Sequence, residues 1–342
     1  MANSPIIRDF DGSTIDLNDR TILVTGGTGS FGKQFVRTIL ERFKPRRVIV
    51  FSRDEMKQFE MARDLPTERY PAMRYFIGDV RDERRLEMAM RGVDYVIHAA
   101  ALKQVPTAEY NPFECIHTNV WGAENVVNAA LRNDVKRVVA LSTDKAANPS
   151  NLYGASKLAS DKIFVAANNL AGADGTRFAV VRYGNVVGSR GSVVPLFADL
   201  IAQGADHLPI TDDRMTRFWI TLQQGVNFVL SSLATMQGGE IFVPRIPSMR
   251  IVDLARTMAP GLPHKLVGIR PGEKLHEVMI TEDDARTTVE LDDRYVIQPP
   301  FVWWEERASP SGGRPVTDGF RYASDSNPEW LDSQTLTTFL KD

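Results

Sequence analysis

A short β-branched run that leads into three regularly spaced glycines constrains the fold of this chain more than any other feature. The run Thr21–Thr25 is followed directly by glycines at positions 26, 29 and 32, and a helical pattern covers residues 31–43. In a strand–turn–helix of this kind, the backbone approaches a pyrophosphate and the helix N-terminus stabilises its charge. The sequence therefore predicts a dinucleotide site in this region.

Apolar runs and helical patterns alternate along the first half of the chain. Further buried strands are expected at residues 47–51, 73–77, 95–98, 137–141 and 178–182. Helices are expected between them, including 82–90 and 120–132. This alternation predicts an α/β fold, a Rossmann-like doubly wound parallel sheet with its site at the carboxyl ends of the strands. A smaller C-terminal substrate-binding domain is expected to follow.

Three parts of the chain are distinguished by their patterns. Residues 15–185 are expected to form an NADP-binding Rossmann domain, to which later segments return. Residues 186–298 have shorter elements, more Pro and Gly and two segments dense in Arg, and we assign them to a substrate-binding part. The tail, residues 299–342, is aromatic and polar by turns, and its pattern indicates no role.

Composition excludes several classes of protein. Lys and Arg number 41 and Asp and Glu 43, a net charge of −2, so no basic excess indicates a nucleic-acid partner. The single cysteine, Cys115, excludes an internal disulfide and a multi-cysteine zinc site, and it fits a reducing cytoplasm. The sequence has no apolar stretch of bilayer length and no charged-then-apolar leader. We expect a soluble cytoplasmic protein with no membrane partner and no metal.

The end of the second strand bears on the choice between NAD and NADP. It reads Ser52-Arg53-Asp54, whereas the acidic residue that binds the ribose of NAD usually ends this strand. Arg53 is expected to pair with a 2′-phosphate and Ser52 to hydrogen-bond it, which favours NADP. In the alternative, Arg53 is a solvated loop charge and Asp54 binds the ribose. His98 is interpreted as a packed, hydrogen-bonded residue with no role in metal binding or acid–base chemistry.

The expected cofactor contacts come from the glycine turn, the ends of successive strands and one helix. Asp79 follows the third strand and is expected against the adenine, and the alanines after His98 let the dinucleotide approach the backbone. The full set is Gly26, Thr28, Gly29, Ser30, Phe31, Gly32, Ser52, Arg53, Asp79, Val80, Ala99, Ala100, Lys103, Tyr153 and Lys157.

Tyr153 and Lys157 are separated by one helical turn. The glycine spacing GxxGxxG resembles the short-chain dehydrogenase/reductase superfamily, in which Tyr-x-x-x-Lys is the catalytic pair. Tyr153 as a phenolate takes the proton from a substrate hydroxyl. The ordinary pKa of tyrosine is about 10, and the Lys157 ammonium together with the positive nicotinamide ring favours the phenolate by lowering that pKa. Thr143 is expected to hydrogen-bond the same substrate oxygen. The alternative is a chance pair on a helix surface.

A second acid and base, Asp144 and Lys145, directly follow Thr143. Once C4 of a sugar is a ketone, its C5 proton is acidic, and a neutral Lys145 with a pKa depressed by nearby cations is expected to remove it. A protonated Asp144 is expected to donate to the departing C6 hydroxyl. Return of the hydride to C6 completes the loss of water and regenerates a tightly bound NADP. The alternative is a structural salt bridge at a strand end.

Longer motifs carry a family resemblance from about Thr21 to Glu290. They are Thr143-Asp144-Lys145-Ala146, Asn148-Pro149, Asn151-Leu152-Tyr153-Gly154-Ala155-Ser156-Lys157, Arg182-Tyr183-Gly184-Asn185-Val186, the runs at 100–106 and 215–220, and Gly268-Ile269-Arg270-Pro271-Gly272-Glu273-Lys274-Leu275-His276-Glu277. Together these resemble the configuration-inverting UDP-N-acetylglucosamine 4,6-dehydratases of the extended short-chain dehydrogenase/reductase group, which begin pseudaminic acid synthesis for surface glycans.

Two contrasts within that group sharpen the resemblance. Dehydratases that act on dTDP-glucose carry Glu where Lys145 stands, and larger membrane-anchored relatives that retain the C5 configuration carry Met in place of Tyr153. The resemblance therefore implies a lyase that makes UDP-2-acetamido-2,6-dideoxy-β-L-arabino-hexos-4-ulose. The inversion at C5 is implied by the resemblance alone, as is a homo-oligomeric state.

Cations in the second part of the chain are candidates for the substrate's pyrophosphate and uridine. Arg217, Arg250 and Arg270 lie in segments whose family counterparts face the nucleotide, and Lys103, Asn185 and Glu273 are expected polar contacts from the same side. Two other functions stay open. A nucleotide-sugar 4-epimerase needs the Tyr/Lys pair but no second base, and a non-catalytic NADP-binding sensor needs neither.

Overall fold

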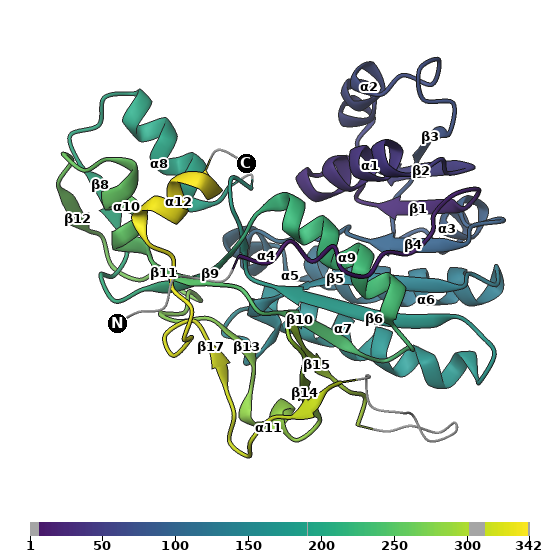
Figure 1. Ribbon diagram of the computed structural model, residues 1–342. Coiled ribbons are helices and arrows are strands. Elements are labelled where there is room, and N and C mark those ends of the chain that lie inside the picture. Colours follow the sequence, from purple (N-terminus) through teal and green to yellow (C-terminus); the bar gives the residue numbers. More distant parts are fainter. Residues whose placement is uncertain (1–6, 190, 301–311, 341–342) are drawn as a thin grey trace.

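A ten-stranded sheet forms the centre of the molecule (Figure 1). The structure, a computed structural model, describes residues 7–189, 191–300 and 312–340. From one edge to the other, the strands are β16 (Arg314–Pro315), β14 (Thr288–Glu290), β15 (Arg294–Ile297), β10 (Ile241–Pro244), β6 (Arg177–Tyr183), β5 (Arg137–Thr143), β4 (Tyr95–His98), β1 (Thr21–Thr25), β2 (Arg47–Ser52) and β3 (Met73–Ile77).

The strands from β3 to β10 are parallel to their neighbours, and β15 begins an antiparallel edge. Along the sheet the winding direction changes between β1 and β4, the place where doubly wound sheets bind their ligands. Thr25 is in register with both Phe51 and His98, so these strands end at the same level. The predicted α/β fold with a doubly wound parallel sheet is confirmed.

Helices cover both faces of this sheet (Figure 1). On one face, α1 (Ser30–Arg42) packs against α9 (Leu222–Thr235), and on the other α3 (Glu83–Ala89), α6 (Gly122–Arg132) and α7 (Leu152–Ala171) pack side by side. A further flanking helix, α2 (Glu55–Asp64), lies against β2 and β3. Strands covered on both faces bury every side chain, which explains why β1 and β4 have no polar–apolar alternation.

The helix predicted at 120–132 begins differently in the structure. Two short helices, α4 (Val105–Tyr110) and α5 (Pro112–Ile116), lead into a π-helical turn, η1 (His117–Trp121), and only then into α6. Within η1, the side-chain amide of Asn119 donates through Nδ2 to the Leu102 carbonyl at 2.9 Å and to Ser156 Oγ at 2.9 Å. It also accepts from the Leu102 amide at 2.8 Å. The widened turn therefore ties α7 to the loop after β4.

A smaller unit stands beside the sheet, at the left of Figure 1. Its elements are β7 (Asn185–Val186), α8 (Val193–Ala202), β8 (Leu208–Ile210), β9 (Thr216–Ile220), β11 (Ser248–Arg250), α10 (Ile251–Met258), β12 (His264–Leu266) and α12 (Ser333–Phe339). It has its own apolar core, in which Phe197, Trp219, Leu254 and Leu336 are buried. Because β10, β14 and β15 belong to the main sheet, the chain crosses between the two units several times.

The C-terminal residues, for which the sequence indicated no role, add strands or helices to both units. Residues 301–311 lie outside the described part of the chain. After them, β16 extends the main sheet, β17 (Tyr322–Ala323) pairs with β13 (Val278–Ile280), and α12 packs on α10. The α12 ribbon lies beside α10 in Figure 1. Glu329 also accepts two hydrogen bonds from Arg8, at 2.7 and 2.8 Å, so the tail holds the N-terminal segment.

Candidate active site

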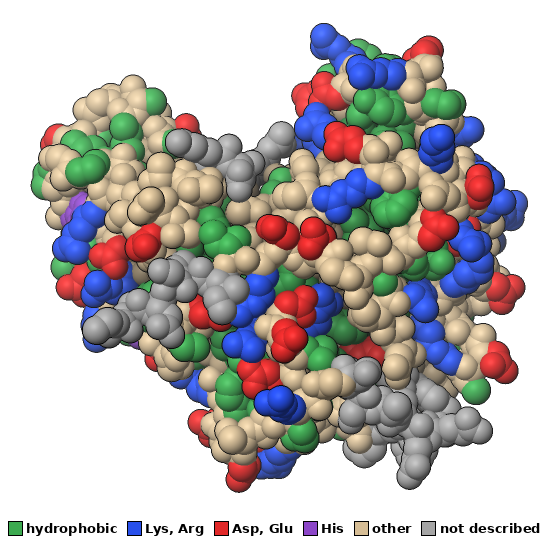
Figure 2. All heavy atoms as spheres, in the orientation of Figure 1, with side chains coloured by type: hydrophobic (Ala, Val, Ile, Leu, Met, Phe, Trp, Pro, Cys, Tyr) green, Lys and Arg blue, Asp and Glu red, His purple; other side chains and the backbone are tan. Residues whose placement is uncertain are grey.

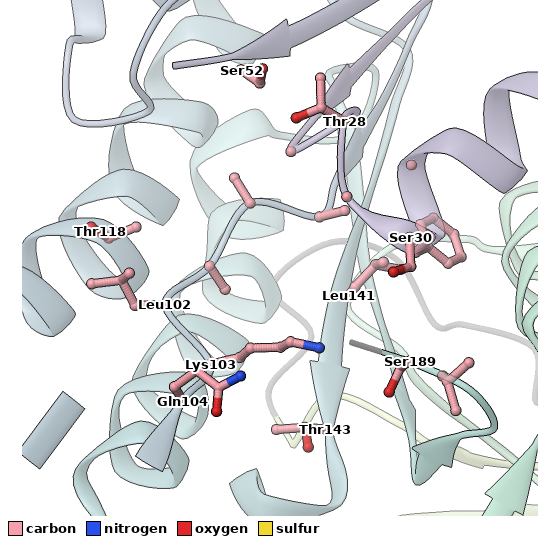
Figure 3. A pocket seen from close by; sticks show the side chains of 18 of the residues that line it. Thr28, Ser30, Ser52, Leu102, Lys103, Gln104, Thr118, Leu141, Thr143 and Ser189 are labelled. Carbon is pink, nitrogen blue, oxygen red and sulfur yellow. The ribbon is translucent and has the colours of Figure 1, made fainter. Parts of the chain in front are cut away.

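A cavity of about 680 Å³ opens at the carboxyl ends of the parallel strands. Figure 3 shows Ser52 and Thr28 at one end, Thr143 at the other, and the Lys103 ammonium pointing into the space between. Figure 2 shows the molecule hollowed between the smaller unit and the lobe that carries α2, with acidic and basic side chains interspersed on the face shown. The cavity joins the glycine turn to Thr143, Lys145, Tyr153 and Lys157, whereas the fifth predicted catalytic residue, Asp144, lies behind Lys145 and does not line it.

The glycine turn forms a close cradle at one end of the cavity. Gly26 has a φ of 63°, and a Cβ at this position would lie 2.8 Å from the Ala100 amide nitrogen. A Cβ on Gly32 would lie 2.5 Å from Gly27 Cα, so only glycine lets α1 pack this closely on the turn. Gly29 is the N-cap of α1 and supplies no capping side chain, which leaves the N-terminal amides of α1 available to an anion.

Thr25 and His98 fix the other wall of this cradle. The Thr25 hydroxyl accepts from the amides of Ala99 and Ala100 at 3.2 and 3.3 Å and lies 2.8 Å from His98 Nδ1. His98 is buried against Phe164, and this burial, with Lys157 nearby, lowers the pKa of His98 to about 3. As expected, His98 is a packed and hydrogen-bonded residue.

The end of β2 lies at the far end of the cavity. Arg53 is half-exposed, and its Nη1 atom lies 3.7 Å from Asp79 Oδ2. Asp54 caps α2 by accepting from the Lys57 amide at 3.0 Å, and its carboxylate also pairs with Lys57 Nζ at 2.8 Å. Both Arg53 and Asp54 line the cavity. The Asp54 carboxylate is engaged in the helix cap, whereas Arg53 shares its partner, Asp79, with Arg81.

All fifteen residues predicted to contact the cofactor line this one cavity. They come from segments far apart in the sequence, and the parallel sheet brings their strand ends together. The members are Gly26, Thr28, Gly29, Ser30, Phe31, Gly32, Ser52, Arg53, Asp79, Val80, Ala99, Ala100, Lys103, Tyr153 and Lys157. Whether each one contacts a bound dinucleotide remains a prediction.

Asp144 and Lys145 form a one-turn helix, η2 (Asp144–Ala146), at the end of β5. Asp144 is buried, and its Oδ1 atom accepts from Thr143 Oγ1 at 2.9 Å and from Lys145 Nζ at 3.0 Å. Its Oδ2 atom is also buried and has no hydrogen-bond partner among the described residues. Burial and the charge of Glu277 raise the pKa of Asp144, although Lys145 acts in the opposite direction. This carboxyl is therefore suited to carry a proton.

Tyr153 and Lys157 lie on the first two turns of α7, with Tyr153 beside Thr143. Burial raises the pKa of Tyr153 to about 12, against the opposing effects of Lys145 and a hydrogen bond with Thr143. Burial lowers the pKa of Lys157, and Asp161 opposes this shift. Lys145 thus opposes the effect of burial on the Tyr153 phenol, and the role that the sequence assigned to Lys157 together with the nicotinamide ring stays a prediction.

The pKa predicted for Lys145 was wrong in direction. Burial lowers it, as would nearby cations, but Asp144 and Glu277 together outweigh both and raise the pKa of Lys145 above its ordinary value. Lys145 Nζ lies 3.0 Å from Glu277 Oε1 and 3.0 Å from Asp144 Oδ1. The sequence could not show this arrangement, because Glu277 reaches η2 from the residue before strand β13, far along the chain.

The residues predicted to bind substrate lie in different environments, some in the cavity wall and others outside it. Lys103 and Asn185 line the cavity. Lys103 is exposed, but partial desolvation of its ammonium by the cavity wall, together with the charge of Lys145, lowers its pKa. Arg217 is buried, and its guanidinium donates to the carbonyl oxygens of Thr216, Lys274 and Leu275 at 2.7, 3.0 and 3.1 Å. Its Nη2 atom also lies 3.5 Å from Glu273 Oε1. Arg217 thus holds the 273–277 segment in place.

Arg250 and Arg270 are both exposed. Arg250 pairs with Asp253 at 2.8 Å on the surface of α10. The backbone of Arg270 is hydrogen-bonded to that of Glu273 at 3.0 Å. Neither arginine lines the cavity.

Two buried hydroxyl groups in the cavity wall were not predicted. Thr118 Oγ1 in η1 and Ser192 Oγ before α8 line the cavity, and neither has a hydrogen-bond partner among the described residues. Buried polar atoms without partners are rare in folded proteins, so these hydroxyls are available to a water or to the polar groups of a ligand in the cavity. No motif in the sequence distinguishes these residues from other hydroxyl residues.

The described residues contain no group of three His, Cys, Asp or Glu side chains arranged to hold a metal ion. Within the same residues, no helix has both the length and the apolar character needed to span a bilayer.

The family described as "Polysaccharide biosynthesis protein" matches residues 22–299. The chain belongs to this family. A Campylobacter jejuni relative named UDP-N-acetylglucosamine 4,6-dehydratase (inverting) is 59% identical over 325 residues, which cover 93% of this chain and 96% of the relative. The resemblance stated from the sequence motifs is confirmed.

Two solved structures share this architecture. Pen from Bacillus thuringiensis is 36% identical and superposes with a TM-score of 0.86 over 96% of this chain and 98% of its own. DesIV from Streptomyces venezuelae, a dTDP-glucose 4,6-dehydratase solved with NAD and TYD bound, is 26% identical with a TM-score of 0.66. That match covers 75% of this chain and 86% of DesIV. A nicotinamide dinucleotide is thus bound by a member of this structural group.

Proposed function

We propose that this protein removes water from UDP-N-acetylglucosamine and inverts C5. The product is UDP-2-acetamido-2,6-dideoxy-β-L-arabino-hexos-4-ulose, and the reaction is the first step of pseudaminic acid type surface glycan synthesis. The observation that carries the proposal is the pairing of buried Asp144 with Lys145, which lines the cavity together with Tyr153. A hydride transfer alone needs Tyr153 and Lys157, whereas removal of water needs a second acid and base.

The cavity fits a dinucleotide because its cradle leaves no room for side chains at positions 26 and 32, and its wall offers unpaired Thr118 and Ser192 hydroxyls. A nicotinamide dinucleotide held by the glycine turn and the N-terminus of α1 would supply the hydride chemistry that oxidation at C4 and reduction at C6 require. We assign it as NADP, because Arg53 and Asp54 both line the cavity but the Asp54 carboxylate is already engaged by Lys57 in the α2 cap. A guanidinium suits a 2′-phosphate.

Oxidation at C4 needs a base for the C4 hydroxyl proton, and we assign this role to Tyr153. Thr143 lies beside the phenol and hydrogen-bonds the same substrate oxygen. Because burial raises the pKa of Tyr153 to about 12, the phenolate depends on nearby positive charge, which Lys145 and Lys157 provide. Both lysines line the cavity.

Elimination needs a neutral amine and a protonated acid at the same time. Transfer of one proton from Lys145 Nζ to Asp144 Oδ1, across their 3.0 Å hydrogen bond, creates both. Lys145 then removes the C5 proton, and Asp144 donates its proton to the C6 hydroxyl, which leaves as water. Lys145 takes up the C5 proton on one face, and delivery of a solvent-derived proton to the opposite face of C5 gives the inverted product.

Substrate contacts come from both units in this proposal. Lys103 and Asn185 bind the sugar nucleotide within the cavity, and residues 186–298 supply the nucleotide side. Among the arginines, we place Arg270 nearest the pyrophosphate, with Glu273 beside it, and Arg250 farther out. Arg217 acts indirectly, by holding the segment that follows Glu273. We further propose that the protein is a cytoplasmic homo-oligomer.

Proton NMR of UDP-N-acetylglucosamine incubated with the purified protein in D2O tests the function. A new 6-deoxy methyl signal with deuterium at C5 is expected, and the ring couplings report the change that inversion brings. A galacto-configured product that keeps its C6 hydroxyl would instead make the protein a 4-epimerase. Unchanged substrate would favour another sugar nucleotide or a non-catalytic NADP-binding sensor.

A further inference from the structure

Glu277 places a second carboxylate at the reaction centre. Its side chain is 1% exposed, and Oε1 lies 3.0 Å from Lys145 Nζ and 3.8 Å from Arg217 Nε. Its other oxygen, Oε2, lies 3.8 Å from Lys274 Nζ and accepts no hydrogen bond from any described residue. Three cations thus surround one buried carboxylate.

Asp144 has a different environment, although it is buried to the same degree. Its charged partner is Lys145 alone among the described residues, and its second contact is the neutral hydroxyl of Thr143. A buried charge is stable only when it is paired and hydrogen-bonded, so the carboxylate with more cations keeps its charge more firmly. Burial raises the pKa of Glu277, but the three cations outweigh it and lower the pKa, whereas that of Asp144 is raised.

We propose that Glu277 is a positioning residue that holds Lys145 beside Asp144 and carries the fixed negative charge of the cluster. Asp144 is then the carboxyl that exchanges its proton. The proposal rests on the dehydratase function above and adds a residue to its machinery. Neither Glu277 nor Asp144 lines the cavity, and because Glu277 Oε1 lies 3.0 Å from Lys145 Nζ and its charge is held by three cations, we assign its effect to Lys145 and not to the sugar.

The segment that carries Glu277 is fixed on several sides, as a positioning role requires. Lys274 Nζ donates to the Ala147 carbonyl at 2.7 Å, directly after η2, and Arg217 donates to the Lys274 and Leu275 carbonyls. The Glu277 amide donates to Ser324 Oγ at 2.9 Å. The carboxylate is therefore placed by backbone anchors that do not depend on Lys145.

Competitive labelling of Lys145 with acetic anhydride, followed by peptide mass spectrometry, measures this effect in the full chain without any substrate. In Glu277→Gln the ammonium loses one of its two anions, so its pKa falls and the neutral amine forms at lower pH. A pKa lower by about one should raise labelling near neutral pH by about tenfold. Glu277→Asp, which keeps the charge, should restore the wild-type labelling profile, and the exposed Glu282→Gln serves as the matched control.

Turnover of UDP-N-acetylglucosamine provides the second measurement. In Glu277→Gln, kcat should fall on the order of a hundredfold and the alkaline limb of its pH profile should move to lower pH, with KM within about twofold of wild type. A Lys145 labelling profile identical in wild type and Glu277→Gln would overturn the proposal, as would a fall in kcat with no shift of the alkaline limb. If wild type itself turns over no UDP-N-acetylglucosamine, the dehydratase function fails, while labelling still decides whether Glu277 holds the charge of Lys145.

Discussion

The amide nitrogen of Asn151 donates to the carbonyl oxygen of Gly272 at 2.7 Å. The amide oxygen of the same side chain accepts from the Gly154 nitrogen at 2.8 Å and so caps α7, the helix of Tyr153. One side chain therefore joins the start of α7 to the segment that leads to Glu277.

Substitution at Asn151 should separate the contribution of the α7 cap to stability from the contribution of the bond to Gly272 to turnover. Asn151→Ala removes the cap and should lower the free energy of unfolding by about 1 kcal/mol, whereas Asn151→Asp keeps a capping oxygen and should cost less. Both variants lose the donor to Gly272 and should lower kcat by roughly ten- to hundredfold, because the two segments are no longer held in register. Urea unfolding and steady-state kinetics measure the two effects. Wild-type kcat in Asn151→Asp would show that the bond to Gly272 is dispensable.

Gly32→Ala should damage the cofactor site through packing. The added Cβ would lie 2.5 Å from Gly27 Cα, a backbone atom that cannot move without opening the turn. We expect a loss of about 1–3 kcal/mol in the free energy of unfolding, together with weaker dinucleotide binding. Gly12→Ala is the control, since no atom lies within 4 Å of a Cβ there. Calorimetric titration with NADP and NAD measures binding, and equal affinities in both variants would contradict the prediction.

Arg53→Ala should discriminate between the two dinucleotides. If Arg53 pairs with the 2′-phosphate, its loss should raise the Kd of NADP by about ten- to hundredfold and leave the Kd of NAD within about threefold. Arg63→Ala provides the control, because this exposed arginine of α2 does not line the cavity. Equal losses for NADP and NAD would assign Arg53 a structural role through its contact with Asp79.

Lys145→Ala should stop the reaction between oxidation and elimination. Without the Lys145 amine the C5 proton stays in place, so dehydration should fall by roughly 10²–10⁴-fold. Oxidation should be slower, because Lys145 also favours the Tyr153 phenolate, but Lys157 remains, so the 4-keto sugar and reduced cofactor should accumulate on the protein. Absorbance of the reduced nicotinamide and the methyl region of the proton NMR spectrum measure the two steps. Lys162→Ala, an exposed lysine on α7, should behave as wild type. Full dehydratase activity in Lys145→Ala would remove Lys145 from the mechanism.

His98 should make the protein sensitive to acid. Its pKa is lowered from 6.5 to about 3, so the unfolded chain binds a proton that the folded protein does not accept until the pH is far lower. The stability contributed by the neutral ring is present above pH 6.5 and is lost as the pH falls toward 3. From about pH 8 to about pH 5, wild type should lose about 2 kcal/mol more than His98→Gln. Urea unfolding at both pH values measures this, and equal losses would refute it.

The sequence by itself determined the features that depend on short spacings. The glycine turn, the buried parallel strands and the pairs Asp144–Lys145 and Tyr153–Lys157 each lie within one element or at its end. Local backbone geometry decides such features, because side chains one helical turn apart share a face and the ends of parallel strands share an edge. The same logic brought the predicted cofactor residues to one cavity.

Only the tertiary structure decided how the charges are paired. The cation neighbours expected to depress the pKa of Lys145 are outweighed by Asp144 and by Glu277, which arrives from the start of β13. Arg217, expected at the substrate, is buried and holds the segment of Glu277. Electrostatic interactions act through space and depend on burial, so residues that are remote in sequence fixed the charge state of a motif whose own residues were correctly identified.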